Sequence, residues 1–149
     1  MSSDEKFLPE GVPGWHQPFW DSLRERNIKV QRCTSCKAFR HVPKEICAKC
    51  RSTSFSWEPV SGRGVVYTYT IVHRAPTPAY QAAAPYAIVH AAMDEGFRMV
   101  AAMTGVDPDA VEIGAPVRVV YTDLSPDWTI VEFEPATDTE ELVDNARDN

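Results

Sequence analysis

The stretch CTSCKAFRHVPKEICAKC, residues 33–50, contains all four cysteines of this 149-residue chain. They form two Cys-x-x-Cys pairs with ten residues between the pairs. Each pair places two sulfurs on one side of a tight turn, and two facing turns give the tetrahedral sulfur coordination that suits zinc. The spacing therefore predicts a zinc site whose ligands are Cys33, Cys36, Cys47 and Cys50. Iron bound in the same cage is the alternative.

Residues around this cluster offer little apolar material for a core. Between residues 28 and 60 the apolar side chains are Ile28, Val30, Phe39, Val42, Ile46, Phe55 and Trp57. So small a core does not hold a fold by burial alone, whereas structural zinc contributes on the order of 10 kcal/mol. A closed four-cysteine shell leaves no position for substrate, and a redox pair needs a βαβ context that does not follow here. Residues 28–60 are therefore interpreted as a structural, rubredoxin-like zinc ribbon.

The segment before the ribbon, residues 1–27, contains the aromatic stretch GWHQPFWDSLRERN. Trp15, Phe19 and Leu23 recur every four residues, with Trp20 beside them, which predicts an amphipathic helix over about residues 18–27. Two interpretations stay open. The aromatic stripe packs on its own chain, or Trp15, Phe19 and Trp20 present a surface to a partner.

After residue 61 the pattern changes to β-branched and aromatic runs that are typical of strands. Five strands are expected, over 64–74, 85–94, 97–104, 115–122 and 128–134. A helical turn over 107–111 separates the third strand from the fourth. This order is that of a five-stranded OB barrel over residues 61–136. The acidic residues 137–149 lack an apolar face and are expected to form a mobile tail.

A proline- and alanine-rich stretch, APTPAYQAAAPY, connects the first two expected strands. It is too long for a minimal hairpin, and long loops often carry function. It is either a plain surface loop or a partner-docking or ligand-gating loop anchored by Tyr80 and Tyr86.

Charge is distributed unevenly over a chain with net charge −6. Residues 24–51 hold nine cations against two acids, which gives +7 there, or about +5 once four thiolates bind a divalent metal. An acidic chain with one basic module is poorly suited to bulk nucleic-acid binding, and a single anionic ligand or an acidic partner patch fits better. There is no apolar run of membrane-spanning length and no secretory signal pattern at the start, so a cytoplasmic protein is expected.

Two further functions are weighed against these features. OB barrels bind single-stranded nucleic acid on aromatic side chains, but Tyr67 and Tyr69 share a strand face with Val65 and Ile71, which is interpreted as core. An independent small-molecule enzyme needs a reactive group, and no signature joins a histidine to Ser and Asp. Of the histidines, His90 is interpreted as a packed residue and His73, beside the long loop, as the best functional candidate.

Taken together, these segments resemble a known family. A zinc ribbon that follows an aromatic helix and precedes an OB barrel is similar to the zinc-ribbon/OB-fold proteins that accompany thiolases and thiolase-like, lipid-transfer-protein-type aldolases. The resemblance covers roughly residues 15–135 and is carried by PFWDSLRERNIKVQRC (18–33), CTSC (33–36), CAKC (47–50), GRGVVYTYTIVHR (62–74), PYAIVHAAMDEG (85–96) and IGAPVRVVY (113–121).

The resemblance implies an accessory subunit without an active site of its own. Such proteins pair with a thiolase-fold subunit, and the resemblance implies a heterotetramer with two copies of each subunit. They help bind the CoA part of an acyl-CoA. The partner makes or breaks a carbon–carbon bond next to the thioester, in lipid, steroid side-chain or aromatic catabolism. The resemblance carries over the four cysteine ligands residue by residue, and it does not assign the CoA contacts.

Charge and aromatic character supply candidates for those contacts. Coenzyme A presents phosphates and an adenine ring, which call for basic side chains and an aromatic face. Sites also prefer the interface between modules. The expected CoA-binding residues are Lys37, Phe39, Arg40, Lys44, Trp57 and Arg63.

Overall fold

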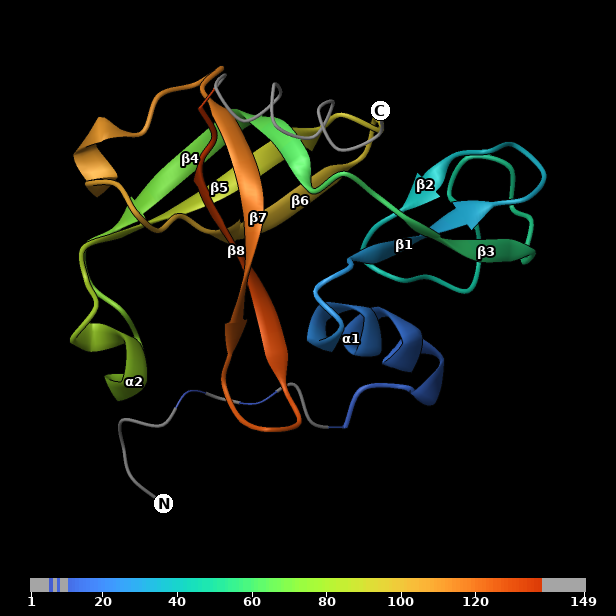
Figure 1. Ribbon diagram of the computed structural model, residues 1–149, viewed down its shortest axis with the longest axis horizontal. Coiled ribbons are helices and arrows are strands. Elements are labelled where there is room, and N and C mark those ends of the chain that lie inside the picture. Colours follow the sequence, from blue (N-terminus) through green and yellow to red (C-terminus); the bar gives the residue numbers. More distant parts are fainter. Residues whose placement is uncertain (1–5, 7, 9–10, 138–149) are drawn as a thin grey trace, which may run out of the picture.

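Short helices and strands follow one another along residues 6, 8 and 11–137, the part of the chain that the computed structural model describes (Figure 1). In chain order they are η1 (Gly14–His16), α1 (Gln17–Arg24), β1 (Lys29–Cys33), β2 (Phe39–Arg40), β3 (Phe55–Pro59), β4 (Arg63–Val72), α2 (Pro78–Gln81), β5 (Tyr86–Met93), β6 (Arg98–Ala102), η2 (Pro108–Ala110), β7 (Pro116–Asp123) and β8 (Thr129–Pro135). The predicted tail lies, from residue 138 onward, outside the described residues.

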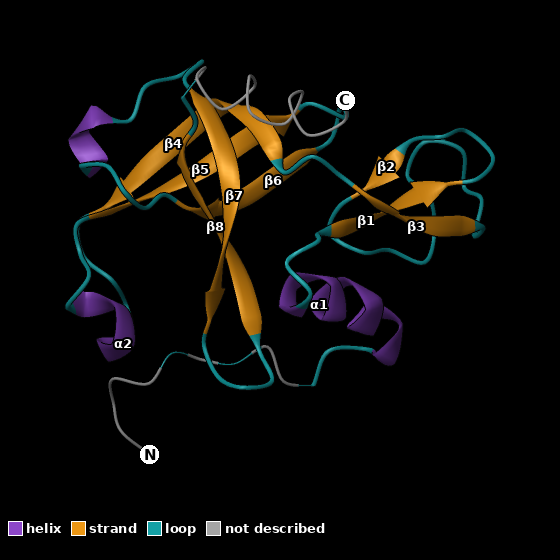
Figure 2. Ribbon diagram, in the orientation of Figure 1, coloured by secondary structure: helices purple, strands orange, loops and turns teal. Residues whose placement is uncertain are grey.

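Five antiparallel strands form the larger sheet, in the order β6-β5-β4-β7-β8. The two outer strands meet where Met103 forms a parallel bridge with Phe133, and the Thr104 N–H donates to the Phe133 carbonyl at 2.7 Å. Figure 2 shows the strands wrapping around one another beside the smaller sheet. This order and near closure are those of an OB barrel, so the predicted mainly β architecture is confirmed.

The barrel interior follows from the alternation of side chains along its strands. On β5 the buried residues are Ala87, Val89, Ala91 and Met93, and the residues between them are half-buried. The turn between β5 and β6 needs Gly96, whose φ of +87° is a left-handed conformation that glycine adopts without strain. The two strands expected over 85–94 and 97–104 are thereby joined by a tight turn.

Strand β4 departs from simple alternation. The pairing register with β5 shifts between Val66 and Thr68, so one additional residue is inserted and the buried side changes. Val66 is buried, whereas Val65 and Tyr67 are 41% and 50% exposed. The predicted buried face comprised Val65, Tyr67, Tyr69 and Ile71. It is wrong for Val65 and Tyr67, whereas Tyr69 packs against the core.

Helix α1 covers one end of the barrel and contacts β1, β7 and β8. Phe19 and Leu23 are buried in the same apolar core as Ile28 of the ribbon and Phe133 of the barrel. For Phe19 the interpretation as packing on its own chain is thus confirmed. The helix ends at Arg24, about one turn earlier than predicted. Among the described residues, no helix has the length and apolar character needed to cross a membrane.

The smaller sheet has the order β2-β1-β3 and carries the cysteine cluster. It lies beside the barrel, with α1 adjacent to both (Figure 1). The long loop between β4 and β5 contains α2, which begins with a proline in its first turn and which the sequence analysis did not predict. The ribbon, the helix and the barrel therefore share one apolar core, and the loop projects from the opposite side of the barrel.

Replacing Gly64 with alanine is expected to destabilise the barrel. A Cβ at this position would lie 2.4 Å from the Ala92 carbonyl oxygen and 3.0 Å from the Met93 Cα, so β4 and β5 would have to separate. The expected loss is about 1–3 kcal/mol of unfolding free energy, measured by urea denaturation. Gly14→Ala is the control, because nothing lies within 4 Å of its added Cβ. Equal midpoints for the two variants would contradict this prediction.

Candidate metal centre and neighbouring surfaces

The structure brings the four predicted ligands together. The four Sγ atoms lie within 4.8 Å of one another. The Cys33–Cys50 and Cys36–Cys47 sulfur pairs are each 3.6 Å apart. Tetrahedral zinc with Zn–S bonds of about 2.3 Å places neighbouring sulfurs about 3.8 Å apart. The cage therefore has the size and the donor set that zinc requires.

The two cysteine turns have the same backbone construction. The Lys37 N–H donates to the Cys33 carbonyl at 3.0 Å, and the Arg51 N–H donates to the Cys47 carbonyl at 2.8 Å. Lys37 and Arg51 each follow the second cysteine of a pair, and each has a left-handed φ, 63° and 65°. The local sequence thus forms two equivalent Cys-x-x-Cys turns, which we call the first and second knuckle. Strand β1 and the loop that follows it place the two knuckles opposite each other.

The protonation state of the four cysteines depends on whether the cage holds a cation. A hydrogen bond from the Cys36 backbone amide lowers the pKa of Cys33 to about 5. At Cys50, the Ser52 amide favours the thiolate, but burial and the neighbouring sulfurs outweigh it and raise the pKa to about 11. Without a metal the four thiols do not all ionise at neutral pH, whereas a bound divalent cation stabilises four thiolates.

Arg40 lies inside the ribbon, with only 4% of its surface exposed. Its Nη1 donates to the Lys44 and Glu45 carbonyls at 3.3 and 3.2 Å. Its Nη2 donates to the Ser52 and Ser54 carbonyls at 2.9 and 3.0 Å. One guanidinium thereby joins the loop after β2 to the segment after the second knuckle.

Interaction with the cysteine sulfurs also favours a charged Arg40 inside the ribbon. Burial opposes its charge, but the Cys33 and Cys47 sulfurs outweigh this effect and raise its pKa. Arg40 thus has a structural role inside the ribbon, which the sequence analysis, placing it among the CoA-binding residues, did not predict. Sequence alone did not reveal it, because an arginine among other basic residues is more often exposed.

The other predicted CoA-binding residues are spread over the ribbon and its junction with the barrel. Lys37 and Lys44 are exposed. Phe39 is half-buried, with its ring 5.6 Å from that of Phe97 in the barrel. Trp57 is half-buried and edge-on to a neighbouring phenylalanine. Arg63 lines a small cleft of about 170 Å³ that none of the other predicted residues lines. The structure thus does not gather them into one cavity.

The predicted partner-binding aromatics divide into two places. Trp20 packs edge-on against Trp128, with ring centroids 5.5 Å apart, a contact that the sequence analysis missed. Trp15 is half-buried beside α1. Tyr80 and Tyr86 lie together, with centroids 6.3 Å apart, and line a groove of about 600 Å³ between the long loop and the barrel.

Another cleft, of about 420 Å³, opens where α1, the ribbon and the barrel meet. Apolar side chains dominate its walls; it is lined by His16, Phe19, Trp20, Leu23, His41, Val42, Pro43, Val100, Ile130 and Val131. The sequence analysis did not find it, because its walls come from four segments that are far apart in the chain.

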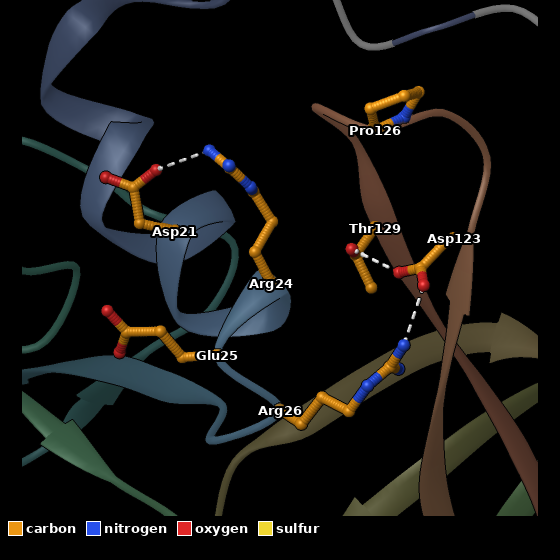
Figure 3. Close-up of a pocket in the computed structure, with 7 residues that line it drawn as sticks. All are labelled: Asp21, Arg24, Glu25, Arg26, Asp123, Pro126 and Thr129. Carbon is orange, nitrogen blue, oxygen red and sulfur yellow. Dashed lines mark hydrogen bonds and ion pairs between the residues drawn. The ribbon is translucent and has the colours of Figure 1, made fainter.

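A polar cleft of about 530 Å³ lies between α1 and the β7–β8 hairpin (Figure 3). Arg26 Nη2 contacts Asp123 Oδ2 at 2.7 Å, and the Thr129 hydroxyl donates to Asp123 Oδ1 at 2.7 Å. These contacts, Thr129 first and then Arg26, lower the pKa of Asp123. A carboxylate held ionised by two partners is not a general acid, so this cleft is interpreted as a structural joint between helix and barrel.

The histidines lie in different surroundings. His41 lies between the rings of Phe19 and Phe97, and burial lowers its pKa to about 4. It is therefore neutral at physiological pH. His90 is half-buried on the outer face of the barrel, edge-on to Tyr67 with centroids 5.9 Å apart. His73, the best candidate from the sequence, is exposed at the end of β4.

Comparisons with known proteins agree with this architecture. Residues 20–56 match the family model described as "ChsH2, rubredoxin-like zinc ribbon domain", and residues 57–122 match "ChsH2, C-terminal OB-fold domain". A solved structure described as "Ltp2-ChsH2(DUF35) aldolase" is 31% identical, with a TM-score of 0.76 over 85% of this chain and 98% of that chain. The chain belongs to the ChsH2/DUF35 family. The predicted family resemblance is thereby confirmed.

Relatives of this ChsH2-type chain carry different names. The 3-oxo-4,17-pregnadiene-20-carboxyl-CoA hydratase alpha subunit of Mycobacterium tuberculosis is 32% identical over 117 residues, which are 78% of this chain and 36% of that protein. A DUF35 domain-containing scaffold protein of Methanocaldococcus jannaschii is 36% identical over 110 residues, 72% of this chain and 77% of that protein. The chain spans just over a third of the length of the hydratase alpha subunits that it matches.

Proposed function

We propose that this chain is a non-catalytic subunit that binds the CoA part of an acyl-CoA and supports a thiolase-fold partner. The observation that carries the proposal is the match to nearly the whole of a chain in a solved structure named for Ltp2 and ChsH2 together as an aldolase. The acyl groups proposed are those of lipid, steroid side-chain or aromatic catabolism. The name of the mycobacterial relative favours the steroid class.

The metal supports folding of the ribbon in this proposal. The four cysteines would hold zinc as thiolates, and the bound ion would supply structural cross-linking rather than an open coordination position. Commitment of these sulfurs to the cage leaves them unavailable as nucleophiles. The reacting groups are therefore assigned to the partner subunit, which performs thiolysis, condensation or retro-aldol cleavage.

Contacts to coenzyme A are proposed at the ribbon and its junction with the barrel. Lys37, Lys44 and Arg63 would pair with the phosphates, while Phe39 and Trp57 would offer aromatic surface to the adenine ring. The support is the excess of nine cations over two acids in residues 24–51. Arg40 is left out of this set, because its N–H groups donate to carbonyls inside the ribbon.

Co-expression with a thiolase-fold subunit tests the proposal. The complex is expected to elute as two copies of each subunit, and it should cleave a CoA thioester that the purified chain alone does not turn over. Mass measurement of the eluted complex and a free-CoA assay give the two readouts. A chain that stays monomeric beside its partner, or that cleaves the thioester by itself, would contradict the proposal.

Removing two ribbon cations is expected to weaken CoA binding. Each exposed pair with a phosphate contributes up to about 1 kcal/mol, so Lys37→Ala with Lys44→Ala should raise the Kd for CoA about tenfold. Isothermal titration calorimetry of the complex measures this change. Lys49→Ala removes an exposed cation on the second knuckle and serves as the control. Equal affinity for the double variant and the control would show that these lysines do not bind the phosphates.

A further inference from the structure

Two aliphatic side chains from different modules lie over the same cleft and are more than half exposed. Val42 of the ribbon is 57% exposed and Val100 of β6 is 58% exposed. Both line the cleft of about 420 Å³ where α1, the ribbon and the barrel meet. We call this cleft, with Val42 and Val100 at its rim and Trp20 and Val131 in its walls, the apolar seam. Large aliphatic groups exposed in contact with a concave apolar surface are typical of an interaction site.

The exposed apolar surface continues beyond the seam on the barrel side. Val100 pairs with His90 on β5, and the His90 ring is 5.9 Å from Tyr67 on β4. Tyr67 and Val65 are 50% and 41% exposed on that outer face. Tyr67 is the residue inserted where the pairing register of β4 with β5 shifts. These exposed side chains lie on three neighbouring strands, and the Arg98 guanidinium lies over the Tyr67 ring, 3.3 Å from its centroid.

The seam also continues toward the long loop. Val131 and its neighbour Ile130 line both the seam and the groove that contains Tyr80 and Tyr86. The aromatics predicted to meet a partner therefore flank the seam from two sides, Trp20 from α1 and the tyrosines from the loop. This continuity favours a protein surface as the occupant over an isolated small ligand.

The positive charge around the seam favours a different subunit over a second copy of this chain as the occupant of the seam. Of the nine cations in residues 24–51, four form ion pairs with acids and Arg40 is buried. The remaining four, Lys37, Lys44, Lys49 and Arg51, are exposed on the ribbon. Exposed Lys44 follows the seam residue Pro43, and Arg98 points to the same side of β6 as Val100. A second copy would bring these cations together, which is unfavourable, whereas an acid-bearing surface complements them.

We infer that the thiolase-fold partner docks on the apolar seam, placing a large apolar side chain between Val42 and Val100 and carboxylates near Arg98. This inference rests on the proposed function and locates the partner on the molecule. Burial of both valines and the outer face of β4–β6 gives the contact its apolar centre, and the cations form its polar rim.

Single aspartate substitutions in the seam test the location, with Ltp2, the protein named in the solved relative, as the probe. Val42→Asp and Val100→Asp each place an unpaired carboxylate in the contact and are expected to weaken Ltp2 binding at least tenfold, measured by calorimetry. Ile113→Asp is the matched control, since Ile113 is 69% exposed and lies outside the seam. Arg98→Glu should weaken binding and reduce its dependence on salt.

The zinc content and the unfolding midpoint of each variant establish that it is folded. Folding is expected to be retained, because the substituted residues are exposed in the wild-type protein. If wild-type protein binds Ltp2 and both seam variants bind equally well, the inference is wrong and the proposed function stands. If wild-type protein does not bind Ltp2, the same variants are measured against the thiolase-fold subunit of the co-expression test, and both claims are rejected if neither subunit binds. If the chain alone forms a dimer that Val100→Asp dissociates, the seam is a self-interface and the inference is likewise wrong.

Discussion

Cys47→Ser is expected to abolish zinc binding and to unfold the ribbon. Cys47 is buried, and its sulfur lies 3.6 Å from that of Cys36. Structural zinc contributes about 10–16 kcal/mol of binding free energy, which is comparable to the whole stability of a domain, about 5–15 kcal/mol. Zinc per chain, measured by elemental mass spectrometry, should fall from about one equivalent to about zero.

Loss of the ribbon should also reach the helix and the barrel. Ile28 and Val30 of the ribbon segment belong to the same buried cluster as Leu23 of α1 and Phe133 of β8. Amide hydrogen exchange is therefore expected to speed up first in β1 and β3 and then in α1. Ser35→Ala, in the other knuckle, removes one exposed hydroxyl contact and is the control. A Cys47→Ser protein that retains one zinc and wild-type exchange would refute the structural role of the metal.

The features that the sequence predicted well are those encoded by local spacing. Two Cys-x-x-Cys pairs determine a four-sulfur cage almost without reference to the rest of the chain. The four-residue spacing of Phe19 and Leu23 likewise predicted an amphipathic helix, and both side chains are buried on α1. In both cases, the physical determinant lies within a few residues of the side chain that it places.

Other features depend on residues that are distant in the chain. A bulge between Val66 and Thr68 reverses the buried face of β4, and nothing in the run of β-branched and aromatic residues marks its position. The apolar seam needs α1, the ribbon loop, β6 and β8 to meet, which no single pattern reports. The burial of Arg40 was missed for the same reason, since two of the four carbonyls that it bonds, those of Ser52 and Ser54, lie beyond the second knuckle.

Arg40→Ala is expected to have the second largest effect, because it removes one side chain that bonds four backbone carbonyls. The acceptors belong to Lys44, Glu45, Ser52 and Ser54. Each buried acceptor left without a donor costs about 1–3 kcal/mol, and water reaching some of them reduces the sum. We therefore expect a loss of about 3–5 kcal/mol in unfolding free energy, measured by urea denaturation of the zinc-loaded protein.

Arg40→Lys tests whether the shape of the guanidinium or its charge is responsible. A lysine ammonium keeps the charge beside the sulfurs, but it has one nitrogen and cannot reach two pairs of carbonyls in opposite directions. If the forked geometry matters, Arg40→Lys should be nearly as unstable as Arg40→Ala and should bind zinc more weakly in a chelator competition. Lys44→Ala, an exposed cation of the same loop, should change stability by no more than about 0.5 kcal/mol. Full stability in Arg40→Lys would mean that the positive charge near Cys33 and Cys47, and not the carbonyl network, is what the ribbon requires.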